Sequence, residues 1–213
     1  MDDQRQAIRQ VLEAGLNAGR NPRSVALELV GRIENGQRTG GIVGLTSQQA
    51  GYVLNARKQL EELDPAYFQR ERRDKRFDKL VKRAIADGKP LAKADVDRIT
   101  GRYADRLLNL RGEVIARTEM IAALHAGQYE GMRQLIETGK VRADQVTKVW
   151  SATGDGRTRD THLAMNGQAV RFDRAFTSPS GAQLRYPHDE SLGAPADEII
   201  QCRCHMTLRV KYL

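Results

Sequence analysis

The chain has 213 residues and a hydrophobic content of 40%, but aromatic residues make up only 5%, so aliphatic side chains must form most of its core. It contains no run of about 18 apolar residues, which excludes a membrane-spanning helix, and its acidic start MDDQ is unlike a signal peptide. The net charge of +8 lies mostly in the first 150 residues, because residues 151–213 hold eight Lys or Arg and seven Asp or Glu. We therefore expect a protein made in the cytoplasm, whose basic part can bind an acidic partner such as nucleic acid.

Two helices are predicted at the start of the chain. Apolar residues recur at helical spacing over residues 2–16, with an acidic residue available to cap the first turn. Asn21 and Pro22 provide an N-cap and a first-turn proline for a second helix that reaches Ile33. The glycine-rich segment 36–44 is then predicted to be a flexible link.

A third helix is predicted from the capping pattern that follows this link. Thr46 and Gln49 stand three residues apart and resemble a capping box, in which each side chain accepts a hydrogen bond from the other residue's backbone. Helical spacing continues to Leu60, and the pair Asp64-Pro65 ends this helix and starts another.

Residues 65–87 are predicted to form one helix with a densely charged surface. Opposite charges recur three or four positions apart, as in Glu71–Lys75 and Asp78–Lys82, and such pairs support a solvated helix. The same segment also carries a stripe of cations that suits contacts with phosphate. The candidate DNA-binding residues are Arg72, Arg73, Lys75, Arg76, Lys79, Lys82 and Arg83. The sequence leaves both interpretations open.

The longest helical pattern covers residues 92–138. Gly101 and Gly112 each cost such a helix about 1 kcal/mol relative to alanine, so we expect either a break or a close helix contact at each. Arg117 and Glu119 lie two positions apart and should reach different neighbours. A buried Glu119 would need a cationic partner, which the C-terminal part could supply.

After residue 139 the pattern changes from helical spacing to short alternating segments. Strands are expected at 146–153, 168–176 and 202–212, and helical turns at 158–165 and 194–201. We therefore predict an α+β protein, in which an all-helical region at 1–140 is followed by a small mixed α/β domain at 141–213.

Both cysteines of the chain lie close to its end. On a regular strand, Cys202 and Cys204 would point to the same face, where two thiolates could bind a metal such as zinc. His162 is the candidate third ligand and His188 a possible fourth. The alternative is that both cysteines are reduced and pack as small apolar residues against Trp150.

Charged residues concentrate in the segment DGRTRDTH at 155–162. Asp155, Arg157, Arg159 and His162 could act as a general acid–base group with cationic stabilisers, as in a nuclease. The same residue types also build a buried network that stabilises a small domain. No nucleophile elbow, glycine-rich phosphate loop or HExxH helix accompanies them, so we favour the structural interpretation over an enzyme.

The order of these motifs resembles the head morphogenesis family of tailed phages, the minor head proteins similar to phage Mu protein F. The resemblance is dense from about residue 112 to residue 204. The residues that carry it are Arg117, Glu119, Trp150, Asp155, Arg157, Arg159, His162, Gly167, Tyr186, Asp189, Cys202, Arg203 and Cys204. Two positions depart from the family pattern, since Gln201 stands where Asn is usual and His188 where Gly is usual. The second departure weakens His188 as a metal ligand and leaves Asp155 or Asp189 as the alternative fourth ligand.

This resemblance implies a minor capsid protein that acts in head morphogenesis. Its expected partners are portal and capsid proteins, together with double-stranded DNA bound without sequence preference. No membrane partner is expected. Its expected location is the virion, in the head interior or at the portal vertex, in several copies, with the host cytoplasm as the site of assembly. The resemblance establishes no enzymatic activity. The alternatives are a nuclease-like enzyme and a zinc-stabilised interaction module.

Overall fold

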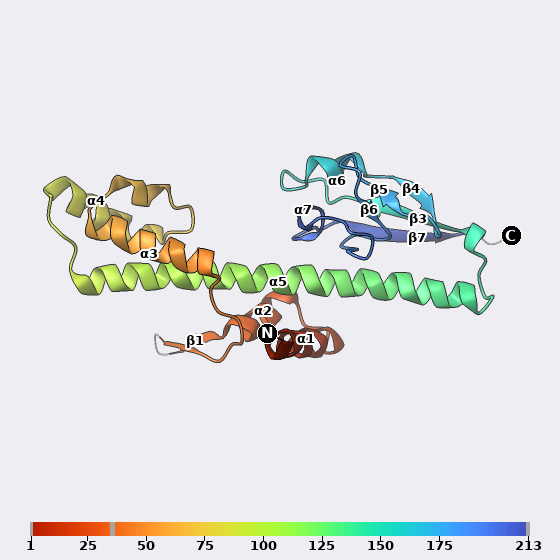
Figure 1. Ribbon diagram of the computed structural model, residues 1–213, viewed down its shortest axis with the longest axis horizontal. Helices are drawn as coiled ribbons and strands as arrows, with labels where there is room; N and C mark the ends of the chain where they lie inside the picture. Colours follow the sequence, from red (N-terminus) through yellow and green to blue (C-terminus); the bar gives the residue numbers. More distant parts are fainter. Residues whose placement is uncertain (1, 35–36, 212–213) are drawn as a thin grey trace. The chain divides into compact units, whose positions relative to one another are not determined.

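The computed structural model describes residues 2–34 and 37–211 (Figure 1). The chain divides into two compact units, Met1–Ile115 and Ala116–Leu213. The long helix α5 (Lys93–Glu137) contributes its first half to one unit and its second half to the other. The predicted boundary at 140/141 instead marks the change from helical to mixed secondary structure, which follows the end of α5.

Both helices predicted at the start of the chain form, and the predicted cap of the second is confirmed. Helix α1 covers Asp2–Asn17 and α2 covers Pro22–Val30. The Asn21 side chain accepts a hydrogen bond of 3.0 Å from the backbone N–H of Ser24, which satisfies a donor that the first turn leaves unpaired.

Part of the segment predicted to be a flexible link, residues 37–39, is paired in a short β-hairpin. Strand β1 (Arg32–Glu34) pairs antiparallel with β2 (Gln37–Thr39), and residues 35–36 lie outside the described residues. Arg38 holds this hairpin by donating to the carbonyls of Val30 and Gly31, at 3.0 and 2.8 Å. The glycine-rich composition of this segment gives no indication of these contacts of Arg38.

Helix α3 (Ser47–Glu61) begins with the predicted capping box. The Thr46 hydroxyl accepts from the backbone N–H of Gln49, and the Gln49 side chain accepts from that of Thr46, each at 3.1 Å. The interaction satisfies two backbone donors at the helix start, which confirms the prediction from spacing alone.

The single helix predicted over 65–87 is wrong. The segment forms two short 3₁₀ turns, η1 (Pro65–Gln69) and η2 (Lys75–Phe77), before helix α4 (Asp78–Asp87). The buried carboxylate of Asp74 interrupts the helix, since it caps η2 through the backbone N–H of Arg76 at 3.2 Å. The expected pairs also change, because Asp78 accepts two hydrogen bonds of 3.0 Å from Arg73.

Helix α5 runs without a break at either glycine, so the prediction of a break is wrong. The alternative prediction of a close contact is confirmed at Gly112, where an added Cβ would lie 2.6 Å from Cγ1 of Val30. Glu119 is exposed, so the condition of burial under which it would need a cationic partner does not arise.

Aliphatic and aromatic side chains from several elements form the core of the first unit. One cluster surrounds α4 and the start of α5, and its fully buried members are Leu60, Tyr67, Val81, Val96 and Ile99. Another joins α3 to α5 through Ala56, Tyr103 and Leu107.

A three-stranded antiparallel sheet organises the second unit. Its central strand is β3 (Val146–Ser151), flanked by β4 (Ala169–Arg171) and β7 (His205–Val210). A hairpin of β5 (Phe176–Thr177) and β6 (Gln183–Leu184), the turn η3 (Ala143–Gln145) and the short helices α6 (Asp160–Ala164) and α7 (Ala196–Ile199) complete the unit.

Two sequence-based boundaries in this unit are corrected by the structure. The strand predicted at 168–176 is interrupted by a turn that separates β4 from β5. The strand predicted at 202–212 begins only at His205, so Cys202 and Cys204 precede the strand. The α+β fold class is confirmed. No helix among residues 2–34 and 37–211 is both long and apolar enough to cross a membrane.

Candidate metal centre

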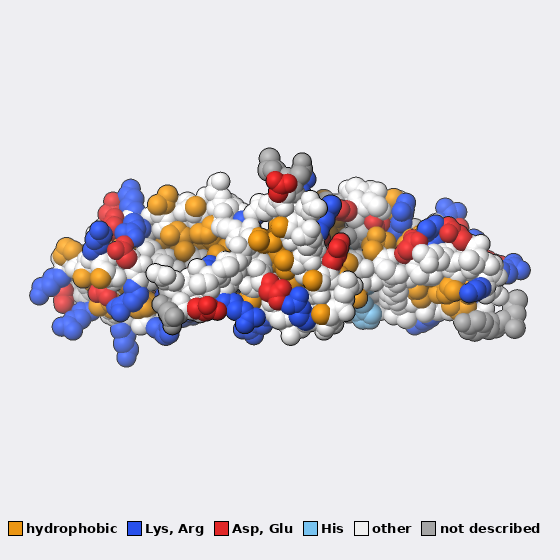
Figure 2. Space-filling view, turned by 90° about the horizontal axis from the view of Figure 1, so that it is seen from below, with side chains coloured by type: hydrophobic (Ala, Val, Ile, Leu, Met, Phe, Trp, Pro, Cys, Tyr) orange, Lys and Arg blue, Asp and Glu red, His pale blue; other side chains and the backbone are white. Residues whose placement is uncertain are grey.

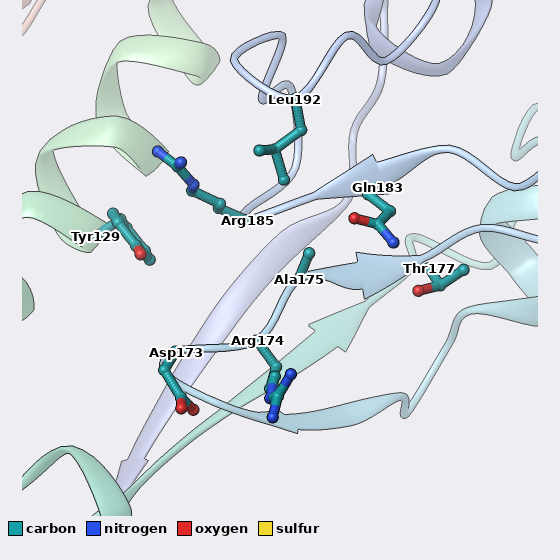
Figure 3. A pocket seen from close by; sticks show the side chains of 8 residues that line it. All are labelled: Tyr129, Asp173, Arg174, Ala175, Thr177, Gln183, Arg185 and Leu192. Carbon is teal, nitrogen blue, oxygen red and sulfur yellow. The ribbon is translucent and has the colours of Figure 1, made fainter.

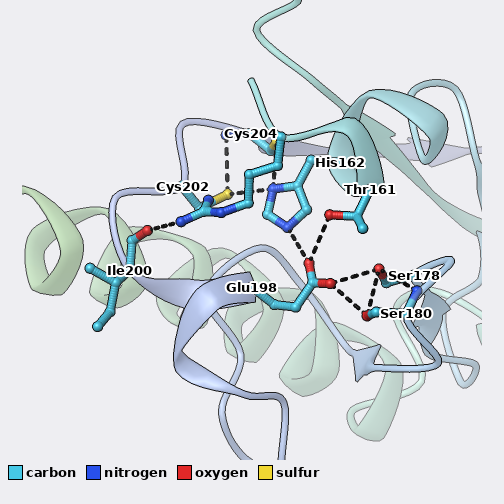
Figure 4. Close-up of polar contacts among 9 residues, drawn as sticks. Thr161, His162, Ser178, Ser180, Glu198, Ile200, Cys202 and Cys204 are labelled. Carbon is cyan, nitrogen blue, oxygen red and sulfur yellow. Dashed lines mark hydrogen bonds and ion pairs between the residues drawn. The ribbon is translucent and has the colours of Figure 1, made fainter. Parts of the chain in front are cut away.

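Three side chains with metal-binding atoms converge inside the second unit. His162 comes from α6, and Cys202 and Cys204 from the segment between α7 and β7. The Nδ1 atom of His162 lies 3.4 Å from Sγ of Cys202 and 3.5 Å from Sγ of Cys204 (Figure 4). All three residues are buried, and their ligand atoms lie within 4.8 Å of one another. Sequence spacing therefore identified a group that the fold does bring together.

The spacing of these atoms fits a tetrahedral zinc ion. With Zn–S bonds of about 2.3 Å and a Zn–N bond of about 2.1 Å, a tetrahedral angle separates sulfur from nitrogen by about 3.6 Å. Both observed separations, 3.4 and 3.5 Å, are close to that value. One imidazole nitrogen has a single lone pair, so two sulfurs at equal distance from it suit a shared metal better than two hydrogen bonds.

A buried carboxylate sets the tautomer of the histidine. Oε2 of Glu198 lies 2.7 Å from Nε2 of His162 (Figure 4). Because a carboxylate is an acceptor only, Nε2 carries the proton and Nδ1 presents its lone pair to the two sulfurs. A metal-bound histidine commonly donates its other ring N–H to a carboxylate in this way.

Hydroxyl groups keep Glu198 ionised in spite of its burial. Ser178 and Ser180 donate to its Oε1 at 2.9 and 2.6 Å, and Thr161 donates to Oε2 at 3.4 Å. Burial works to raise the pKa of this carboxyl, but the bonds from Ser180, Ser178 and His162 outweigh it and lower the pKa. The charge is therefore maintained next to the imidazole.

The two thiols affect one another strongly. A hydrogen bond from Cys202 outweighs burial and lowers the pKa of the Cys204 thiol to about 5. The same contact raises the pKa of the Cys202 thiol, and burial raises it further. The pair therefore accepts one negative charge readily and needs a cation to accept the second.

The centre is also part of the hydrophobic core. Both cysteines pack in one buried cluster with Trp150, and the rings of Trp150 and His162 meet edge to face with centroids 5.3 Å apart. The remaining members of the cluster are Met165, Phe176, Leu184 and Met206. Metal ligation and apolar packing, which the sequence presented as alternatives, are thus compatible in this geometry.

An ion pair holds the loop before α6, and Asp155 in this loop does not belong to the group of three candidate ligands. Asp155 accepts from the backbone N–H of Arg157 at 3.0 Å and forms a two-pronged ion pair with Arg203. The Arg203 guanidinium, followed by the Arg157 backbone, holds the pKa of Asp155 well below its usual range. Asp155 therefore caps the turn at 155–158, whereas α6 itself begins at Asp160. Arg159 donates to the carbonyl of Ile200, beside the cysteines.

The other motif residues have separate structural contacts. Asp189 is buried and accepts from the backbone N–H groups of Arg185 and Ser191, at 2.8 and 2.9 Å. Gly167 adopts a φ of 81° in the turn before β4 and donates to the Trp150 carbonyl at 2.8 Å. Tyr186 packs against the apolar core.

The structure does not bring every motif residue to the centre. Arg117 and Glu119 are exposed on α5. His188, the possible fourth ligand, lies outside the group of converging ligand atoms. Its Nε2 atom lies 2.9 Å from the carbonyl of Cys202, so it contacts the backbone of a candidate ligand and not its sulfur.

Sequence reasoning missed Glu198 and Lys148. Glu198 sits in the weakly patterned stretch APADEIIQ, where nothing distinguishes it from Asp197.

Lys148 is fully buried on β3 and donates to the Arg185 carbonyl at 2.8 Å. Its ammonium lies within 5.7 Å of the ring centroids of Tyr129, Phe172 and Phe176. Burial lowers its pKa to about 8. A lysine inside a strand pattern of β-branched residues was the available signal.

A separate cavity of about 460 Å³ lies on another side of the same unit (Figure 3). Its wall contains the side chains of Tyr129, Asp173, Arg174, Ala175, Thr177, Gln183, Arg185 and Leu192. Most of these residues are exposed, and Asp173 is paired with Arg171. The cavity is a shallow polar depression, and it contains no group of metal ligands among the described residues.

The candidate DNA-binding residues lie on η2, on α4 and on the turn before them. Figure 2 shows many blue side chains at the end of the molecule that carries these elements. Three of the seven are committed to carboxylates: Arg73 to Asp78, Arg76 to Asp74 and Arg83 to Asp87. Among the described residues, Arg72, Lys75 and Lys79 are exposed and have no ion pair, whereas Lys82 lies over the Phe68 ring.

Comparison with known proteins identifies one family. The family model described as Phage Mu protein F like protein matches residues 6–207 of the chain. No curated protein and no solved structure matches it. The family match spans both units, including the loosely patterned helices before residue 112.

Proposed function

The chain belongs to the family of phage Mu protein F like proteins, and from this membership we propose that it is a minor head protein of a tailed phage or prophage. The family supports a role in phage head morphogenesis, in contact with other structural proteins of the head. We place it at the portal vertex, in several copies per virion. The observation that carries this proposal is the match over residues 6–207, because it includes both units and not the C-terminal motifs alone.

Purified virions provide the direct test. Mass spectrometry of heads should detect the chain at a small fraction of the major capsid protein, and cross-linking should join it to the portal protein. Deletion of its gene should reduce the yield of filled heads. Normal yields from the deletion, together with absence of the chain from wild-type heads, would contradict the proposal.

We also propose that the basic surface of the first unit contacts packaged DNA. The support is the excess of cations before residue 151 and the exposure of Arg72, Lys75 and Lys79 without carboxylate partners. These side chains can neutralise phosphates without first breaking an ion pair. Binding of this kind is independent of sequence and weakens steeply as salt rises.

Zinc is the metal that the second unit is best suited to bind. Two thiolates and an imidazole are typical zinc ligands, and their spacing matches tetrahedral coordination. When bound, zinc would neutralise the two thiolates and link α6 to the segment before β7, so its role in this proposal is structural. Elemental analysis of freshly purified protein should find about one zinc per chain, and metal-free folded protein with two titratable thiols would contradict it.

The geometry does not favour the nuclease-like alternative. Both ring nitrogens of His162 are engaged, one with Glu198 and one with the two sulfurs, so neither is available to take a proton from a water molecule. Asp155 is likewise held by Arg203. These contacts suit a structural metal site better than hydrolysis.

A further inference from the structure

We propose that the fourth coordination position of this metal centre is open and binds a small exogenous anion or water through one donor atom. The inference rests on the proposed zinc site and specifies which kind of ligand completes it. A structural zinc is normally enclosed by four protein ligands, whereas three protein ligands and an open position make the metal accessible from solvent.

The protein supplies three ligand atoms and no evident fourth. Among the described residues, the converging group consists of His162, Cys202 and Cys204. His188 is bound to the Cys202 carbonyl through Nε2, and Asp155 is held by Arg203. The Nδ1 atom of His188 is buried without a hydrogen-bond partner, but it does not belong to the converging group, so the tetrahedron remains one protein ligand short.

A narrow cavity borders two of the three candidate ligands. It has a volume of about 10 Å³ and is lined by both His162 and Cys204. This volume is close to the roughly 10–15 Å³ that a single water molecule requires. One oxygen or nitrogen atom fits there, but a protein side chain does not.

The charge around this cavity favours an anion. Its other lining residues are Thr153, Arg157, Thr158, Arg159, Gln201 and Arg203. Arg203 is neutralised by Asp155, but Arg157 is exposed and has no ion pair among the described residues. The arginines would attract a negatively charged donor to the metal, and no carboxylate is among the residues that line the cavity.

Cobalt substitution tests the open position directly. Co²⁺ bound at the centre should give thiolate charge-transfer bands and d–d bands, and Cys204→Ser should abolish or strongly change them. Adding azide should then shift the d–d bands with saturable dependence on azide concentration. X-ray absorption should show two sulfur ligands and two nitrogen or oxygen ligands, with one of the latter replaced by azide.

A matched pair of variants tests whether the arginines that line the cavity attract the anion. Arg157→Gln should weaken azide binding about two- to fivefold, the size of effect expected for one exposed charge. Arg209→Gln removes the same charge from an exposed position on β7 and should leave azide binding unchanged. Equal weakening by the two variants would show a general charge effect and would overturn this part of the inference.

The outcomes separate the two proposals. Failure of Co²⁺ to bind in one equivalent at the cysteines contradicts the metal site itself. If Co²⁺ binds in one equivalent but its spectrum does not change with azide, the zinc proposal is retained and the open position is contradicted. A protein group must then complete the tetrahedron. A saturable azide shift, sensitive to Arg157→Gln, supports both.

Discussion

At the scale of single residues, Glu198 determines how His162 can act. Its carboxylate accepts a hydrogen bond of 2.7 Å from the Nε2–H of His162 and is itself fixed by the hydroxyls of Ser178 and Ser180. The imidazole is therefore oriented and polarised before any metal arrives. This chain of contacts is the reason that Nδ1, and not Nε2, faces the sulfurs.

Replacing Glu198 by Gln should weaken zinc binding about 10- to 100-fold, because contacts of this type strengthen and orient a histidine ligand. Competition with a chromogenic chelator measures the change. Glu190→Gln, at an exposed position of the same unit, is the control and should bind zinc as the wild type does. Equal affinities for all three proteins would show that Glu198 does not position the ligand.

Asp74 is the corresponding buried charge of the first unit. Its side chain is 1% exposed, and it accepts hydrogen bonds from Arg76 and an ion pair of 3.2 Å from Arg106. The bonds from Arg76 outweigh burial and lower the pKa of this carboxyl to about 2, from an ordinary value of 3.8. A carboxyl with a lowered pKa in the folded state stabilises the fold above its unfolded pKa.

Asp74→Asn should therefore reduce the free energy of unfolding by roughly 2 kcal/mol at pH 7. The difference from wild type should shrink as the pH falls from about 4 to about 2, because the wild-type carboxyl becomes protonated in that window. Urea unfolding at several pH values measures it. The exposed control Asp87→Asn should change little, and a pH-independent loss in Asp74→Asn would refute the electrostatic explanation.

At the scale of elements, local capping signals were reliable and long helical patterns were not. The Thr46–Gln49 capping box and the Asn21 cap form as spacing predicted, because both partners lie within one turn. The helix predicted over 65–87 fails because Asp74 finds partners in Arg76 and, from α5, Arg106. That second partner is 32 residues away, and no local pattern reports it.

The interruption of the helix predicted over 65–87 also changes which cationic side chains are free to contact DNA. Replacing Arg72, Lys75 and Lys79 together by Gln should weaken binding to double-stranded DNA of any sequence. If each contacts one phosphate, the slope of log affinity against log salt should become shallower by about 3. Fluorescence anisotropy over a range of salt concentrations measures both quantities.

The control for this variant replaces Arg5, Arg9 and Lys140 by Gln, which removes the same charge from other exposed positions. It should retain nearly the full slope. If both triple variants lose equal affinity, the net charge of the chain and not this surface binds DNA. If neither does, the DNA contact is wrong while the head role remains.

At the scale of the whole molecule, the second unit depends on few apolar residues. Its central cluster contains seven buried residues, two of them cysteines. Zinc bound at 1,000 times its dissociation constant would add about 4 kcal/mol of stability. Metal therefore has a large effect on a unit of this size.

Chelation should accordingly lower the melting temperature of the second unit by at least about 10 °C while leaving the first unit's transition in place. Differential scanning calorimetry with and without a strong chelator measures it. His162→Ala should already melt at the lower temperature and should not respond to the chelator. Identical melting of zinc-loaded and chelated wild type would exclude a stabilising metal.

The amino-acid sequence alone determined the α+β class, the helices that begin at local caps, the pattern of short strands and the family resemblance. These features depend on residues that are neighbours along the chain or on the order of motifs. The sequence also identified His162, Cys202 and Cys204, since few other residues in the chain can bind zinc. It placed the cysteines on a strand that in fact begins at His205.

Only the tertiary structure decided how those residues work. It brought Glu198 and the serine hydroxyls to the far side of the imidazole, enclosed Lys148 among aromatic rings and closed the turn at 155–158 with Arg203. It also formed a cavity of about 10 Å³ beside His162 and Cys204. Contacts between distant residues depend on the packing of the complete unit, and residue spacing carries no record of them.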